Sequence, residues 1–137
     1  MGKIRLMVVE DETIVSLDLQ SRLRTMGYEV VGAVGTGEEA ISKAGEHRPD
    51  LVLMDVGLRG NIDGVQAAEQ IKKSYQIPVI FLTASSDERT IQRAKLTEPF
   101  GYILKPFEDR ELHSHIEIAV YKHGSEAQLR KGKSAFR

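Results

Sequence analysis

Short apolar runs alternate with longer helical patterns five times along this 137-residue chain, and no other feature constrains its fold as strongly. The short runs are predicted strands, and the longer patterns place apolar residues at helical spacing. The predicted strands are 4–9, 28–34, 51–54, 78–82 and 100–104, and the predicted helices are 12–26, 37–47, 64–74, 87–96 and 108–122. Strict alternation of this kind predicts a parallel sheet with helices on both faces.

Right-handed crossover connections then favour one fold class, a flavodoxin-like (βα)5 doubly wound parallel sheet with strand order 2-1-3-4-5. Two helix starts are marked in the sequence. Thr36 stands at an N-cap position with Glu39 at capping-box spacing, and Asp63 is a predicted N-cap for the third helix. Ligands of such folds bind beyond the carboxyl ends of the strands, beside strand one. Functional side chains are therefore expected at that edge.

Polar residues follow the central strands at the predicted edge. Glu10 and Asp11 follow the first strand, Asp55 the third, Thr83 the fourth and Lys105 the fifth. Because these strands are neighbours in the predicted order, the five side chains are expected to converge on one site. Two carboxylates about 4 Å apart repel each other by roughly 4 kcal/mol at an effective dielectric constant of about 20, and a hard cation relieves that repulsion.

The residue types at this edge predict phosphoryl chemistry. A few carboxylates without His or Cys favour Mg²⁺ (or Mn²⁺), and Mg²⁺ often completes its coordination shell with phosphate oxygens. Asp55 can accept a phosphoryl group as an aspartyl phosphate. Lys105 would neutralise the phosphoryl oxygens, and the Thr83 hydroxyl would donate to one of them. The site is thus expected to receive a phosphoryl group on Asp55.

Four motifs in register, VVEDE, LVLMD, PVIFLTA and YILKPF, resemble the receiver domain of two-component response regulators over about residues 3–123. The resemblance implies that Glu10 and Asp11 bind Mg²⁺ together with Asp55 and the backbone carbonyl of Gly57. It also implies that Asp55 receives its phosphoryl group from the phosphohistidine of a histidine kinase or phosphotransfer protein.

The resemblance further implies a conformational switch. Thr83 would contact the phosphoryl group and draw the following loop inward, leaving room for Tyr102 to rotate. The surface of the fourth predicted helix, fifth strand and fifth helix would then change. A downstream protein target or a fused module would recognise that surface, which is also a candidate for homodimer formation. The Lys105–Pro106 peptide bond is expected to be cis, as is usual in this family.

The loop after Asp55 departs from the common family pattern. Arg59 occupies a position where proline is common, and the loop up to Asp63 is one residue longer than the commonest form. Receivers fused to sensor and kinase modules often share this form, so the start of the third helix is expected to be displaced. Gly57 and Ser85 stand at positions that tune phosphoryl hydrolysis in the family, and no phosphoryl lifetime is predicted from them.

Composition excludes several classes of function. The chain has no cysteine, which excludes disulfides, thiolate nucleophiles and Cys-based metal sites. Its formal net charge of −1 gives no bias toward nucleic acid or anionic membranes. No apolar run approaches the roughly 20 residues of a membrane span, and the N-terminus lacks a signal-peptide pattern. A cytoplasmic protein without membrane or direct nucleic-acid partners is expected.

The domain organisation is predicted as a receiver at residues 1–123 followed by a basic tail at 124–137. The tail is either a frayed end or the start of a linker to a module absent from this chain, such as a sensor or kinase domain. No recognition motif follows that would support nucleic-acid binding. The domain is expected to be no enzyme in the ordinary sense, because it would catalyse only its own phosphoryl transfer and slow dephosphorylation.

Two other classes of protein stay open from the residues alone. A Mg²⁺-dependent phosphohydrolase also forms an aspartyl phosphate, but such enzymes typically carry D-x-D-x-T after strand one, where residues 10–13 are EDET. A flavodoxin-like nucleotide binder or a pseudo-receiver would lack phosphotransfer. No phosphate-binding glycine loop follows strand one, and the acidic run there would repel phosphate. Asp55 could also be a strand-end cap, and Tyr102 a packing residue.

Overall fold

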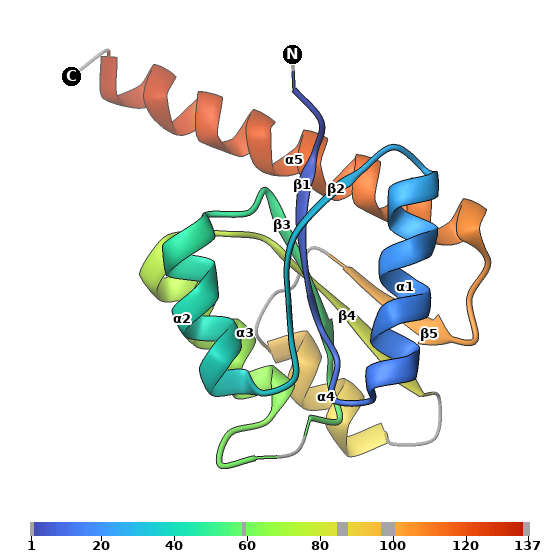
Figure 1. Cartoon of the computed structure of the whole chain (residues 1–137). Coiled ribbons are helices and arrows are strands. Elements are labelled where there is room, and N and C mark those ends of the chain that lie inside the picture. Colours follow the sequence, from blue (N-terminus) through green and yellow to red (C-terminus); the bar gives the residue numbers. More distant parts are fainter. Residues whose placement is uncertain (1, 59, 85–87, 97–100, 136–137) are drawn as a thin grey trace.

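The computed structural model describes residues 2–58, 60–84, 88–96 and 101–135, with the backbone alone for residues 90, 96 and 125–135. Five parallel strands form one sheet in the order β2-β1-β3-β4-β5 (Figure 1). The elements are β1 (Arg5–Val9), α1 (Thr13–Thr25), β2 (Glu29–Val34), α2 (Gly37–His47), β3 (Leu51–Asp55), α3 (Gly64–Tyr75), β4 (Val79–Ala84), α4 (Glu88–Leu96), β5 (Gly101–Lys105) and α5 (Asp109–Ala135). The predicted fold class and strand order are confirmed.

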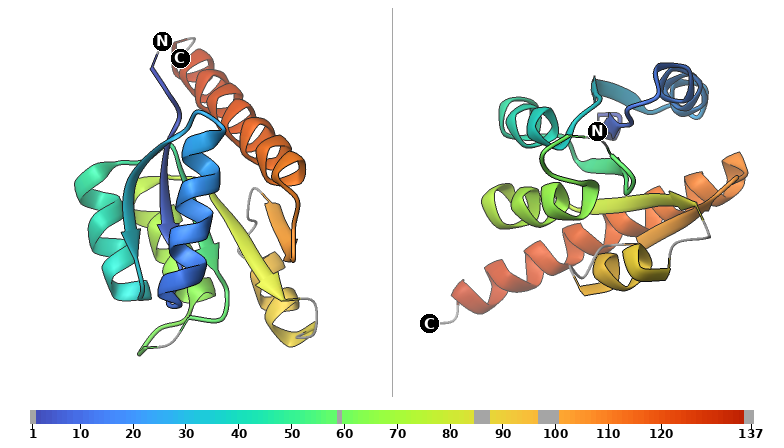
Figure 2. Two further views of the ribbon diagram at one scale, coloured as in Figure 1. Left: turned by 45° about the vertical axis from the view of Figure 1, so that its right-hand side comes forward. Right: turned by 90° about the horizontal axis from the view of Figure 1, so that it is seen from below.

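Helices cover both faces of this sheet (Figure 2), because successive strand residues point to opposite sides. On β1, Leu6 and Val8 pack under α1 and α5, whereas Met7 and Val9 pack under α2 and α3. Strand β3 is buried on both faces as well, from Leu51 to Met54. Each fully buried aliphatic side chain contributes roughly 1.5–3 kcal/mol, so the central strands anchor the edge on which the site lies.

Side chains that the sequence marked as caps begin two of the helices. Asp63 accepts a hydrogen bond from the backbone N–H of Gln66, and the Gln66 side chain accepts one from the Asp63 N–H, which completes a capping box. Thr36 accepts from the Glu39 N–H, but its hydroxyl donates to the Glu39 carboxylate, so only half of the predicted box forms. Asp87, the first residue of the predicted helix 87–96, lies outside the described residues.

Helix α5 corrects the predicted end near residue 122, since it continues to Ala135 and projects beyond the sheet (Figure 1). Ala119 is fully buried, whereas Tyr121 is 77% exposed. Apolar periodicity reports where a helix touches the core, not where its backbone stops being helical, so the sequence pattern ended too early. The other predicted boundaries agree within two residues in the part of the chain that can be compared. No helix in the described part of the chain has the length and apolarity that a membrane span requires.

Candidate functional site

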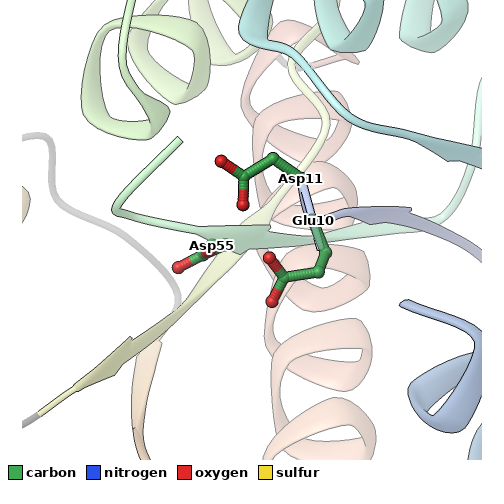
Figure 3. Close-up of side chains that lie close together, drawn as sticks. All are labelled: Glu10, Asp11 and Asp55. Carbon is green, nitrogen blue, oxygen red and sulfur yellow. The ribbon is translucent and has the colours of Figure 1, made fainter. Parts of the chain in front are cut away.

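Three carboxylates converge where β1 and β3 end. The two strands pair in register, with Val9 opposite Met54, so the residues that follow them emerge side by side. Glu10, Asp11 and Asp55 each offer an oxygen within 4.8 Å of the others (Figure 3). Glu10 is only 6% exposed. Clustered oxygen ligands of this kind suit a hard divalent cation, and Mg²⁺ in particular.

Lys105 brings a positive charge to these carboxylates from β5. Its Nζ lies 3.1 Å from Oε1 of Glu10 and 3.6 Å from Oδ1 of Asp55. Burial by itself lowers the pKa of Lys105, but the charges and hydrogen bonds of Asp55 and Glu10 outweigh burial and raise it above its ordinary value. The ammonium is therefore protonated at neutral pH, and it is positioned to neutralise an anionic group bound at Asp55.

Two glycines shape the backbone around Asp55. The Gly57 N–H donates to Oδ1 of Asp55 at 3.2 Å, which orients the carboxylate from the β3–α3 loop. Gly64, the first residue of α3, packs so closely that a Cβ there would overlap the Asp55 carbonyl oxygen. Sequence reasoning assigned no role to Gly64. The sequence shows only that Gly64 follows the predicted N-cap Asp63. A side chain is ordinarily tolerated at that position, so nothing in the sequence marked the close contact with Asp55.

The proposed switch residues lie on the two strands beside this cluster. Leu82 on β4 pairs with Asp55, so the next residue, Thr83, lies just beyond it at the same edge. Thr83 is buried, and its hydroxyl donates to the Ala84 carbonyl at 3.1 Å. Tyr102 lies on β5 and is 38% exposed. Two further residues singled out in the sequence, Arg59 and Ser85, fall outside the described residues, as does the loop 85–87.

The structure thus brings together Glu10, Asp11, Asp55 and Lys105, with Gly57 hydrogen-bonded to the acceptor carboxylate. The Lys105–Pro106 peptide bond is cis. Thr83 is at the correct edge, but its hydroxyl is turned to the backbone. A five-stranded parallel sheet with an acidic cluster and a lysine at its carboxyl edge is the arrangement that the sequence predicted for a receiver domain.

Comparison with known proteins gives the family. The response regulator receiver domain model matches residues 6–117, and the chain belongs to this family of two-component signal-transduction domains. The transcriptional regulatory protein PdtaR of Mycobacterium tuberculosis is 40% identical over 116 residues, which are 85% of this chain and 56% of PdtaR. The phyllosphere-induced regulator PhyR of Methylorubrum extorquens is 31% identical over 117 residues, 85% of this chain and 43% of PhyR. The chain spans about half the length of these relatives.

A solved structure agrees. The signal receiver domain of a modulated diguanylate cyclase from Desulfovibrio desulfuricans G20 superposes with a TM-score of 0.87 at 39% identity, covering 91% of this chain and 99% of that one. The resemblance inferred from the four sequence motifs is therefore confirmed. Receiver domains generally bind Mg²⁺ in an acidic pocket, and the cluster of Glu10, Asp11 and Asp55 has the ligand chemistry for it.

Proposed function

We propose that this receiver domain accepts a phosphoryl group on Asp55 from the phosphohistidine of a histidine kinase or phosphotransfer protein. The observation that carries the proposal is the position of the Lys105 ammonium, 3.6 Å from the Asp55 carboxylate at the edge where Glu10 and Asp11 also end. Three carboxylates without a basic partner would suit a cation site alone. The added ammonium suits an anion that arrives at the same carboxylate.

In the proposed reaction an Asp55 oxygen attacks phosphorus as the P–N bond of the donor breaks. The bonding pair returns to the imidazole nitrogen, and an acyl phosphate forms on Asp55. Lys105 would exchange part of its contact with Asp55 for the phosphoryl oxygens. Mg²⁺, bound by Glu10, Asp11, Asp55 and the Gly57 carbonyl, would neutralise charge on the transferring group. Mn²⁺ has similar oxygen preferences and is expected to substitute.

The output is proposed to follow from Thr83. Its hydroxyl would leave the Ala84 carbonyl for a phosphoryl oxygen, and Tyr102 would rotate. This shifts the population between two states of the α4-β5-α5 surface, which a downstream protein, a fused module or a second copy would recognise. Support comes from the burial of Thr83 and the partial exposure of Tyr102.

The organisation proposed for the chain is a receiver at 1–123 and a linker beginning at 124. The continuation of α5 to Ala135 supports a helical linker to a further module rather than a frayed end. We propose a cytoplasmic signalling role without membrane or direct nucleic-acid contacts, and no turnover of an external substrate.

Intact-protein mass spectrometry tests the proposal most directly. The wild type and Asp55→Asn would be incubated with acetyl phosphate and Mg²⁺, with EDTA as a control. We expect one hydroxylamine-labile phosphoryl adduct on the wild type alone, and no adduct when EDTA is present. An adduct on Asp55→Asn, or none on a wild type that binds Mg²⁺, would contradict phosphoacceptance at Asp55. Turnover of an aryl phosphate would indicate a phosphohydrolase instead.

A further inference from the structure

The segment that connects β5 to α5 holds Lys105, and an arginine from α1 binds this segment at two points. Nη2 of Arg22 donates to the Phe107 carbonyl at 2.9 Å, and Nε donates to Oδ1 of Asp109 at 2.5 Å. The guanidinium carbon also lies 4.8 Å from the centroid of the Phe107 ring. The Arg22 side chain thus binds the backbone carbonyl two residues after Lys105 and the carboxylate four residues after it.

A groove separates α1 from this segment elsewhere. It has a volume of about 330 Å³ and is lined by Glu10 and Lys105 next to the acidic cluster, by Arg22, and by apolar side chains between them. Pro106 is exposed. Beside this groove, the hydrogen bonds from Arg22 and the packing of the partly buried Phe107 ring against the core both tie the segment to the body of the domain.

The chemistry of this contact requires an arginine. A planar guanidinium presents N–H groups in fixed directions, so it can satisfy a carbonyl and a carboxylate at the same time while its face lies on an aromatic ring. Asp18, one turn earlier on α1, lies 3.8 Å from the same group and adds a second negative charge beside it. Arg22 is only 26% exposed, so these interactions are partly shielded from water.

We propose that Arg22 is a positioning residue for phosphoryl transfer, which holds the β5–α5 segment so that the Lys105 ammonium stays at Asp55. This inference rests on the proposed role of Asp55 as the phosphoacceptor. Arg22 acts through Lys105 and not on the phosphoryl group itself. When these Arg22 interactions are lost, Phe107 shifts, and Lys105, two residues away, shifts with it.

The first measurement is the maximal rate of adduct formation with acetyl phosphate at saturating Mg²⁺. Arg22→Met keeps the aliphatic stem but removes the guanidinium, and the rate is expected to fall roughly ten- to a hundredfold, as for a small misplacement of a catalytic group. Affinity for Mg²⁺ is expected to be unchanged, since its ligands are at β1 and β3. Arg24→Met is the matched control, because Arg24 is exposed on the same helix and bonds Gln20 at 3.4 Å.

A double-mutant cycle separates positioning from general stabilisation. If Arg22 acts through Lys105, adding Arg22→Met to a Lys105→Met variant produces no further loss of rate. A merely structural role would slow both backgrounds equally. Asp109→Asn removes the charge that faces Arg22 while keeping its shape, and a smaller loss in the same direction is expected. That variant keeps the test decisive if Arg22→Met does not fold.

An NMR comparison gives a readout that needs no phosphoryl chemistry. The amide shifts of Lys105 and Phe107 are expected to change in Arg22→Met and to stay in place in Arg24→Met. Unchanged shifts, an unchanged rate, or an equal loss of rate in the Lys105→Met background would overturn the role of Arg22 alone. A wild type that never forms the adduct would overturn the phosphoacceptor proposal, and the positioning role with it.

Discussion

The ammonium of Lys105, at the end of β5, spans the neighbouring strand β4 and lies 3.6 Å from Oδ1 of Asp55 at the end of β3. It also bonds Glu10, at the end of β1, at 3.1 Å. One long side chain therefore links three strand ends. Lys105 contacts two of the three clustered carboxylates, and the oxygen ligands that Glu10, Asp11 and Asp55 offer together favour a divalent cation there.

Replacing Asp55 by asparagine removes one of the mutually repelling carboxylates. In EDTA, we expect Asp55→Asn to be as stable as the wild type or more stable, because relief of repulsion from Glu10 and Asp11 offsets the loss of the Lys105 contact. Urea unfolding followed by circular dichroism measures this difference. A marked decrease in stability would mean that Asp55 has a structural role.

Mg²⁺ should then distinguish the two proteins. At ten times its dissociation constant, the ion is expected to raise the free energy of unfolding of the wild type by about 1.4 kcal/mol. That gain corresponds to roughly 4–7 °C in Tm for a domain of this size. Asp55→Asn is expected to require more Mg²⁺ for the same gain. Equal responses in both proteins would show that the ion binds elsewhere.

Gly64 is expected to tolerate no side chain. A Cβ there would overlap the Asp55 carbonyl oxygen and crowd the backbone of Val56. Both are backbone groups, which cannot move away as a flexible side chain can. Gly64→Ala should therefore cost roughly 1–3 kcal/mol of stability and slow phosphorylation by displacing Asp55. Gly57→Ala is the matched control, because its Cβ would lie 3.9 Å from Oδ1 of Asp55 in ordinary contact. Equal urea midpoints for the two variants would refute the close approach.

Asp63 joins the start of α3 to α4 through its ion pair with Arg93, at 2.7 Å. Burial raises the pKa of Asp63, but the hydrogen bonds from Arg93 and from the backbone N–H of Gln66 lower it by more. The pKa of Asp63 therefore lies below its ordinary value. Its stabilisation is therefore complete above the ordinary carboxyl pKa and is lost as the pH falls through the lower, folded value.

Two variants at Asp63 separate its contributions. Asp63→Asn keeps a good N-cap, whereas Asp63→Ala should cost about 1 kcal/mol more at pH 7. The difference in stability between the wild type and Asp63→Asn should shrink as the pH is lowered below about 4. Urea midpoints at pH 7 and pH 3 measure both effects. A difference that grows in acid would contradict the lowered pKa.

Tyr28 predicts behaviour at alkaline pH. Its hydroxyl donates to Glu117 on α5 at 3.0 Å and is 2.8 Å from Nδ1 of His113. Burial first, and then the hydrogen bond and charge of Glu117, raise the pKa of Tyr28 far above its ordinary value. A raised pKa in the folded state supplies stability below the unfolded pKa, near 10, and that stability is lost as the pH rises beyond it.

Tyr28→Phe should therefore make the loss of stability above pH 10 less steep, as measured by urea unfolding at pH 8 and pH 10.5. Phenolate absorbance of the folded protein at pH 11 should be the same in both proteins, because Tyr28 does not ionise until the chain unfolds. A smaller phenolate signal in folded Tyr28→Phe would show that Tyr28 titrates normally.

The sequence by itself determined the order of elements, the parallel sheet and the edge at which chemistry occurs. Apolar periodicity depends on neighbours within a few residues, and parallel strands end at one edge, so Glu10, Asp11, Asp55 and Lys105 could be placed together before any coordinates. The end of α5 could not be predicted, since Tyr121 and Lys122 are exposed while the backbone stays helical.

Only the tertiary structure decided which side chains touch. Arg22 and Asp109 are 87 residues apart, and Lys105 and Glu10 are 95 apart. The close approach of Gly64 to Asp55 likewise depends on where α3 packs against β3. Such contacts depend on how whole helices and strands pack, and every buried residue contributes to that packing. Local sequence patterns therefore do not predict them.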